Sequence, residues 1–141
     1  MTLFNKIFLA DDDEEDIELM QSVINENCSH LHLTVAPDGE VLLQLLQATS
    51  KPDLILLNLK MPFKDGRECL TEIRSNSAFD NIPVAIYSTS SSQADIDYCL
   101  SRGANHYFVK PTSYAGLVSI VQGICNGKLI PFTQYMNYQN A

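Results

Sequence analysis

Long apolar runs are absent from this chain of 141 residues. The longest purely aliphatic run is Leu54 to Leu57, whereas a membrane-spanning helix needs about 20 apolar residues. Near the N-terminus the apolar stretch is broken early by Asp11, Asp12 and Asp13, which argues against a signal peptide. The sequence therefore predicts neither a membrane-spanning nor a secreted protein.

Basic residues are scarce. Nine Lys and Arg residues stand against seventeen Asp and Glu residues, which gives a formal net charge of −8. A surface with this excess of negative charge repels phosphate groups, so a nucleic-acid or anionic-membrane partner is not expected.

Cysteines are few and far apart. The chain has four of them and no Cys-x-x-Cys pair; they are Cys28, Cys69, Cys99 and Cys125. This spacing predicts neither a disulfide framework nor a zinc site, and it fits a protein of the reducing cytoplasm. His30 and His32 are expected to be surface residues, because two imidazoles without a further Cys or His are too few ligands for a metal.

The composition is that of one globular domain, with 45% hydrophobic and 18% charged residues. Five β-rich runs recur at intervals that leave room for a helix between them: residues 5–10, 31–36, 53–58, 83–88 and 105–110. Alternating strands and helices predict an α/β fold with a parallel sheet. The run Asp53 to Asn58 is apolar without alternation, as expected for a strand covered on both faces.

The segments between the runs carry apolar residues at helical spacing, such as Ile17, Met20 and Ile24. Asn126-Gly127 is a stop signal for the last helix. We therefore predict a domain over residues 1–127 and a C-terminal tail over 128–141, which is attached loosely or, as the alternative, docks Leu129, Ile130 and Phe132 on the body or on a partner.

Polar side chains follow the strands at the point where each one ends. They are Asp11 and Asp12, Asn58, Ser88 and Lys110. Ligands of open α/β sheets bind at the carboxyl ends of the strands. Paired carboxylates suit a hard cation such as Mg²⁺, and a hydroxyl and an ammonium group suit phosphoryl oxygens. A nucleotide or flavin binder is disfavoured because no Gly-x-Gly-x-x-Gly loop follows the first strand.

Four segments resemble the receiver domain of two-component response regulators, of the single-domain chemotaxis and sporulation type. In order along the chain they read FLADDD, PDLILLNLKMPFKDG, IPVAIYST and GANHYFVKP. The resemblance covers residues 5 to about 126. It implies a flavodoxin-like, doubly wound (βα)5 fold whose five parallel strands have the order 2-1-3-4-5.

The resemblance also implies roles for individual residues. Asp11 and Asp12 match the acidic pair that holds Mg²⁺, with Asn58 and the backbone carbonyl of Lys60 as further metal ligands. Ser88 and Lys110 match the residues that contact the phosphoryl group. Tyr107 matches the aromatic switch residue, and the Lys110–Pro111 peptide bond matches one that is cis in the family.

Asn58 departs from the family pattern, in which an aspartate at this position accepts the phosphoryl group. A carboxamide is not a competent nucleophile at phosphorus, so phosphorylation is expected to fail here and Mg²⁺ binding to be weakened. The amide of Asn58 is expected to donate to Asp11 or Asp12. The Lys60 side chain is expected to face solvent, with a position beside the acids as the alternative. Gly66 is expected to supply a backbone angle that other residues resist.

These observations predict a pseudo-receiver, a cytoplasmic, non-enzymatic module that acts by protein contact. The natural partners are a histidine kinase, a phosphotransfer protein or a downstream target, and the chain is expected to be a monomer or weak dimer. The alternative is a working, Mg²⁺-dependent receiver that uses another acceptor, such as Asp53 or Asp11, or in which an acceptor aspartate was replaced by Asn58 by design. No output domain is expected after residue 126.

Overall fold

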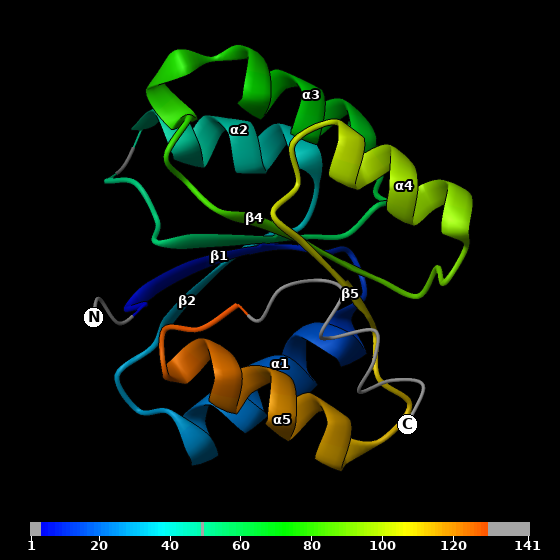
Figure 1. Ribbon diagram of the computed structural model, residues 1–141. Helices are drawn as coiled ribbons and strands as arrows, with labels where there is room; N and C mark the ends of the chain where they lie inside the picture. Colours follow the sequence, from blue (N-terminus) through cyan, green and yellow to red (C-terminus); the bar gives the residue numbers. More distant parts are fainter. Residues whose placement is uncertain (1–3, 49, 130–141) are drawn as a thin grey trace.

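A computed structural model describes residues 4–48 and 50–129 as five strands alternating with helices (Figure 1). The strands are β1 (Lys6–Ala10), β2 (His32–Ala36), β3 (Leu54–Leu57), β4 (Val84–Ser88) and β5 (His106–Val109). The helices are α1 (Glu14–Asn27), α2 (Gly39–Ala48), α3 (Gly66–Ser75), α4 (Gln93–Ser101) and α5 (Tyr114–Cys125), with a short 3₁₀ helix η1 (Ser77–Phe79). Each strand lies within one of the five predicted runs.

The strands form one parallel sheet in the order β2-β1-β3-β4-β5, which confirms the predicted topology. The register aligns the carboxyl ends of the central strands, since Ala10 lies opposite both Ala36 and Leu57. The next residue of β1 is Asp11 and the next residue of β3 is Asn58. The register therefore places these two polar residues side by side at one edge of the sheet.

Helices cover both faces of the sheet. Figure 1 shows α2, α3 and α4 on one face and α1 and α5 on the other. Successive side chains of β1 point to opposite faces of the sheet and so contribute to both apolar clusters. Phe8 packs on the α2–α4 side and Leu9 on the α1–α5 side. All four residues of β3 are buried, as expected for a central strand covered on both faces.

Polar caps position the helices relative to the strand ends. The Asp13 side chain accepts a hydrogen bond from the Asp16 N–H and begins α1 directly after the acidic pair.

The last helix, α5, ends at Cys125, and Gly127 has a φ of +72°. The predicted end of the last helix at Asn126-Gly127 is therefore confirmed.

Two local expectations at the loops were wrong. No peptide bond within residues 4–48 and 50–129 is cis, so Lys110–Pro111 is trans, the isomer that X-Pro bonds favour by about 0.5–1 kcal/mol. Gly66 does not have a positive φ. A Cβ at this position would instead lie 2.2 Å from the Asn58 carbonyl oxygen, so glycine is required here by space rather than by backbone angle.

A disulfide joins Cys28 and Cys125, contrary to the expectation from cysteine spacing. The two residues are separated by 97 positions in the sequence, but they end the two helices that pack on the same face of the sheet. Their Cα atoms are 5.8 Å apart, within the range that a disulfide spans. Cys69 and Cys99 are free, as expected from their spacing, and both are buried.

The C-terminal tail is described only in part. Leu129 is half-buried and packs against the α1–α5 side of the core, whereas Ile130 and Phe132 lie outside the described residues. The domain boundary at residue 127 remains a prediction. Within the described part of the chain, none of the helices combines the length and apolar character needed to cross a bilayer.

Candidate functional site

Asp11 is the most deeply buried charged residue at the carboxyl edge of the sheet, with 0% of its surface exposed. Its Oδ1 accepts a hydrogen bond from the Asp13 N–H at 3.0 Å. Burial raises the pKa of Asp11, and the neighbouring Lys110 ammonium offsets this only in part. Asp12, by contrast, is exposed.

The carboxamide of Asn58 lies against both acids. Its Nδ2 is 3.2 Å from Asp11 Oδ1 and 3.5 Å from Asp12 Oδ1, and it donates to the Lys60 carbonyl oxygen at 2.9 Å. All three neighbours are acceptors, so the nitrogen rather than the oxygen of the amide faces them. Asn58 is 7% exposed. Ionised carboxylates can only accept hydrogen bonds, so the amide group of Asn58 donates to the two neighbouring carboxylates. The expected hydrogen bonds from Asn58 to the acids are present.

Lys110 pairs with two of the carboxylates at this edge of the sheet. Its Nζ lies 2.8 Å from Asp11 Oδ2 and 2.7 Å from Asp16 Oδ2. Burial acts to lower the pKa of Lys110, but the hydrogen bonds to the two carboxylates outweigh it and the pKa is raised. The ammonium group is therefore charged at neutral pH and is shared between a buried and a half-exposed carboxylate.

Asp16 was missed by the sequence reasoning as a member of this group. The sequence reasoning did not single it out at all, although it lies in the first turn of α1. The available signal was its place in the helical turn that begins at the Asp13 cap, directly after the acidic pair.

The side chain of Lys60 is exposed, and only its backbone carbonyl reaches the site, through the bond from Asn58. The solvent-facing interpretation of the side chain is thereby confirmed. The cation beside the acids is Lys110.

Ser88 and Tyr107 lie around the loop that follows β4. Ser88 is buried, and its Oγ accepts from the Ser90 N–H at 3.1 Å. The Ser88 carbonyl accepts from the Lys110 N–H at 2.7 Å, which joins the two predicted phosphoryl contacts through the backbone. Tyr107 is fully buried, and its hydroxyl donates to the Ser90 carbonyl at 2.8 Å. The ring is thus in an inward position, and burial raises the pKa of its hydroxyl.

Gly66 holds the loop after β3 against the site. Its N–H donates to the Leu59 carbonyl at 2.8 Å, and its α-carbon abuts the backbone of Asn58. This close approach fixes the chain that carries both Asn58 and Lys60.

A Gly66→Ala substitution is expected to lower the free energy of unfolding by about 1–3 kcal/mol, because the added methyl group would push on the Asn58 backbone. Urea denaturation measures the loss. Gly123→Ala is the matched control: it lies within α5, and its nearest neighbour would be 3.6 Å from the new Cβ. The control should be neutral or slightly stabilising, since alanine is the better helix former. Equal effects at the two glycines would contradict this role for Gly66.

Comparison with known proteins agrees with this geometry. Residues 7–122 match the family described as the response regulator receiver domain. The response regulator Rcp1 of Synechocystis is 34% identical over 124 residues, which cover 84% of this chain and 84% of Rcp1. The transcriptional regulatory protein CpxR of Klebsiella pneumoniae is 34% identical over 120 residues; they cover 85% of this chain but only 49% of CpxR, about half its length.

Solved structures of response regulators are also similar to this chain. The phosphorylated cyanobacterial phytochrome response regulator RcpA superposes with a TM-score of 0.79 at 36% identity, covering 86% of this chain and 91% of RcpA. The Mn²⁺-bound form of Rcp1 superposes with a TM-score of 0.77 at 33% identity, covering 85% and 91% of the two chains. The fold, the family match and these relatives agree: the chain belongs to the response regulator receiver domain family of two-component signalling.

Proposed function

We propose that this receiver domain signals through protein contact and does not carry a phosphoryl group on residue 58. The observation that carries the proposal is the carboxamide of Asn58, which follows β3 and donates to the acceptors around it. Formation of an acyl phosphate needs an anionic carboxylate oxygen as the nucleophile. The amide oxygen is neutral and the amide nitrogen is delocalised, so neither can attack phosphorus.

Two other carboxylates, Asp53 and Asp11, are the alternative acceptors. Asp53 precedes β3 and lies at the opposite, amino-terminal edge of the sheet, where its Oδ2 accepts from the backbone N–H groups of Asn5 and Lys6 at 2.8 and 2.9 Å. Asp11 is fully buried and paired with Lys110. Neither presents a free anionic oxygen to a phosphodonor, which favours the pseudo-receiver over the alternative acceptor.

The donor set suits a divalent cation only in part. Asp11, Asp12 and the Lys60 carbonyl offer the oxygen ligands that Mg²⁺ prefers, and one of the related structures is of Mn²⁺-bound Rcp1. In this chain the amide nitrogen of Asn58 faces those oxygens, and the Lys110 ammonium already lies against Asp11. We therefore propose that Mg²⁺, when bound, would be held by these same oxygens with lower affinity than at a site with three carboxylates.

The proposed partners are a histidine kinase, a phosphotransfer protein or a downstream target, contacted through α4, β5 and α5. Tyr107 lies in β5, and its inward ring is tied to the β4–α4 loop through Ser90. A partner that prefers either position of this ring would shift the equilibrium between them by its difference in affinity. A cytoplasmic location and a monomeric or weakly dimeric state are part of the same proposal.

A phosphoryl mimic tests this function. Beryllofluoride with Mg²⁺ forms an acyl-phosphate-like adduct on a carboxylate. When beryllofluoride is added to this chain in the presence of Mg²⁺, the amide NMR signals of Ser88, Tyr107 and Lys110 are therefore expected to stay where Mg²⁺ alone leaves them. The same signals should shift in the Asn58→Asp variant, which is the matched control. Saturable shifts at these residues in the unaltered chain would contradict the proposal and favour a working receiver with another acceptor.

A further inference from the structure

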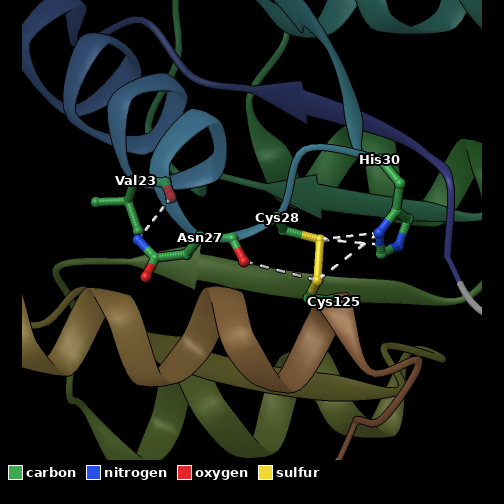
Figure 2. Close-up of a disulfide and its surroundings, with 5 residues drawn as sticks. All are labelled: Val23, Asn27, Cys28, His30 and Cys125. Carbon is green, nitrogen blue, oxygen red and sulfur yellow. Dashed lines mark hydrogen bonds between the residues drawn. A yellow bond between two sulfur atoms is a disulfide. The ribbon is translucent and has the colours of Figure 1, made fainter.

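Three potential metal ligands gather at the amino-terminal edge of the sheet, opposite the edge that carries Asn58. Cys28 ends α1 and is buried, Cys125 is the last residue of α5 and is half-buried, and His30 is exposed on the loop before β2. Figure 2 shows the imidazole of His30 turned toward the disulfide. Its Nδ1 lies 3.4 Å from Cys28 Sγ and 3.9 Å from Cys125 Sγ.

The surrounding fold holds these residues in place independently of the disulfide. The Cys28 N–H donates to the Ile24 carbonyl at 2.8 Å, and the Cys28 carbonyl accepts from the Leu31 N–H at 3.2 Å. α1 and α5 pack together through one apolar cluster that includes Ile24 and Ile124. Because these contacts fix both helix ends, the two sulfur atoms are expected to remain neighbours after reduction.

Reduction converts the pair into a ligand set. A dithiol reductant delivers two electrons and two protons, the S–S bond breaks, two thiols form, and the reductant is itself oxidised to a disulfide. A divalent ion can then replace the two thiol protons, and two thiolates balance its charge. The S–S bond and the metal complex exclude each other, because they use the same sulfur electron pairs.

The spacing matches a zinc-type ion. Zn²⁺ binds thiolate sulfur at about 2.3 Å and imidazole nitrogen at about 2.0–2.1 Å, so one ion joins ligand atoms up to roughly 4.6 Å apart. The ligand atoms of Cys28, His30 and Cys125 all lie within 4.8 Å of one another. The two Sγ–Nδ1 distances of 3.4 and 3.9 Å already lie within this range. Once the S–S bond is broken, side-chain rotation only has to move the two sulfur atoms apart so that one ion fits between them.

We propose that the reduced protein binds one zinc-type divalent ion through Cys28, His30 and Cys125, and that formation of the disulfide expels it. Three protein ligands leave a fourth position, which opens toward solvent on the exposed side of His30. The other two cysteines do not compete, because burial raises the pKa of Cys69 to about 12 and that of Cys99 to about 11, so both remain thiols.

Cobalt titration of the full chain tests the proposal, since Co²⁺ reports thiolate ligation by its charge-transfer absorption and is displaced by Zn²⁺. The anaerobic chain, reduced with a phosphine, is expected to bind one Co²⁺ with this absorption, and the oxidised chain none. Cys28→Ser and Cys125→Ser should abolish the absorption. His30→Ala should weaken binding by at least the roughly 10- to 100-fold that loss of a supporting group costs a metal site.

His32→Ala is the matched control, since His32 is also exposed and lies two residues away on β2. It should bind like the unaltered chain. His30→Ala keeps both thiols and changes an exposed residue, so it remains informative even where a cysteine variant unfolds. The proposal is overturned if the reduced chain shows no thiolate–cobalt absorption, if the oxidised chain binds equally, or if His30→Ala and His32→Ala behave alike.

Discussion

Reduction of the Cys28–Cys125 disulfide is expected to lower the free energy of unfolding by about 4–5 kcal/mol. The two cysteines are separated by 97 positions, so the bond constrains nearly the whole unfolded chain. In the chain-entropy account, a cross-link that closes so long a loop lowers the conformational entropy of the unfolded chain, and breaking the cross-link restores that entropy. This is a large share of the roughly 5–15 kcal/mol that stabilises a typical domain.

Urea denaturation with and without a phosphine reductant measures this effect. A chelator keeps metal ions away from the reduced thiols, since binding to the folded state would restore stability. The Cys28→Ser/Cys125→Ser double variant should match the reduced chain and should not respond to the reductant, which shows that Cys69 and Cys99 play no part. Equal denaturation midpoints for the oxidised and reduced chains would contradict the prediction.

Loss of the Lys110 ammonium group is expected to have the second largest effect. Lys110→Met keeps a long unbranched side chain in place of the aliphatic part of lysine, but it leaves Asp11 buried without its cation. Removal of one partner of a buried ion pair typically costs about 3–5 kcal/mol at neutral pH. Thermal or urea denaturation at pH 7 measures the cost.

The pH dependence of that cost follows from the pKa of Asp11. This pKa is already raised above its ordinary value of 3.8 by burial, and it rises further without Lys110. A carboxyl group whose pKa is higher in the folded than in the unfolded protein stabilises the folded state when it is protonated. This contribution is complete at pH values below the pKa in the unfolded chain, and it is lost as the pH rises through the pKa in the folded protein. The deficit of Lys110→Met should therefore be largest near neutral pH and shrink below about pH 4.

A double variant isolates the buried charge as the cause. In Lys110→Met/Asp11→Asn the buried residue is neutral, so much of the loss at pH 7 should be recovered. A deficit that is the same at pH 4 and pH 7, or that the second substitution leaves unchanged, would show that packing rather than charge explains the effect of Lys110→Met.

The sheet and its polar edge could be predicted because both depend on local patterns. Apolar runs at regular intervals define the strands, and parallel strands bring their carboxyl ends together, so Asp11, Asn58 and Lys110 had to lie at one edge.

The features that the sequence did not reveal depend on tertiary contacts. Cys28 and Cys125 meet because the ends of α1 and α5 lie together, which spacing along the chain does not show. His30 became a candidate ligand for the same reason. Gly66 is required by its approach to the Asn58 carbonyl, a contact between a strand end and a helix start. Propensity rules identify a glycine there but not the atom it must avoid.

Whether residue 58 can accept a phosphoryl group is decided by the intact mass of the chain after incubation with acetyl phosphate and Mg²⁺, measured beside that of the Asn58→Asp variant. We expect no mass gain in the unaltered chain and the gain of one phosphoryl group in the variant, whose new carboxylate would lie beside Asp11 and Asp12. A phosphoryl gain in the unaltered chain would contradict the account, because it would require an acceptor other than residue 58.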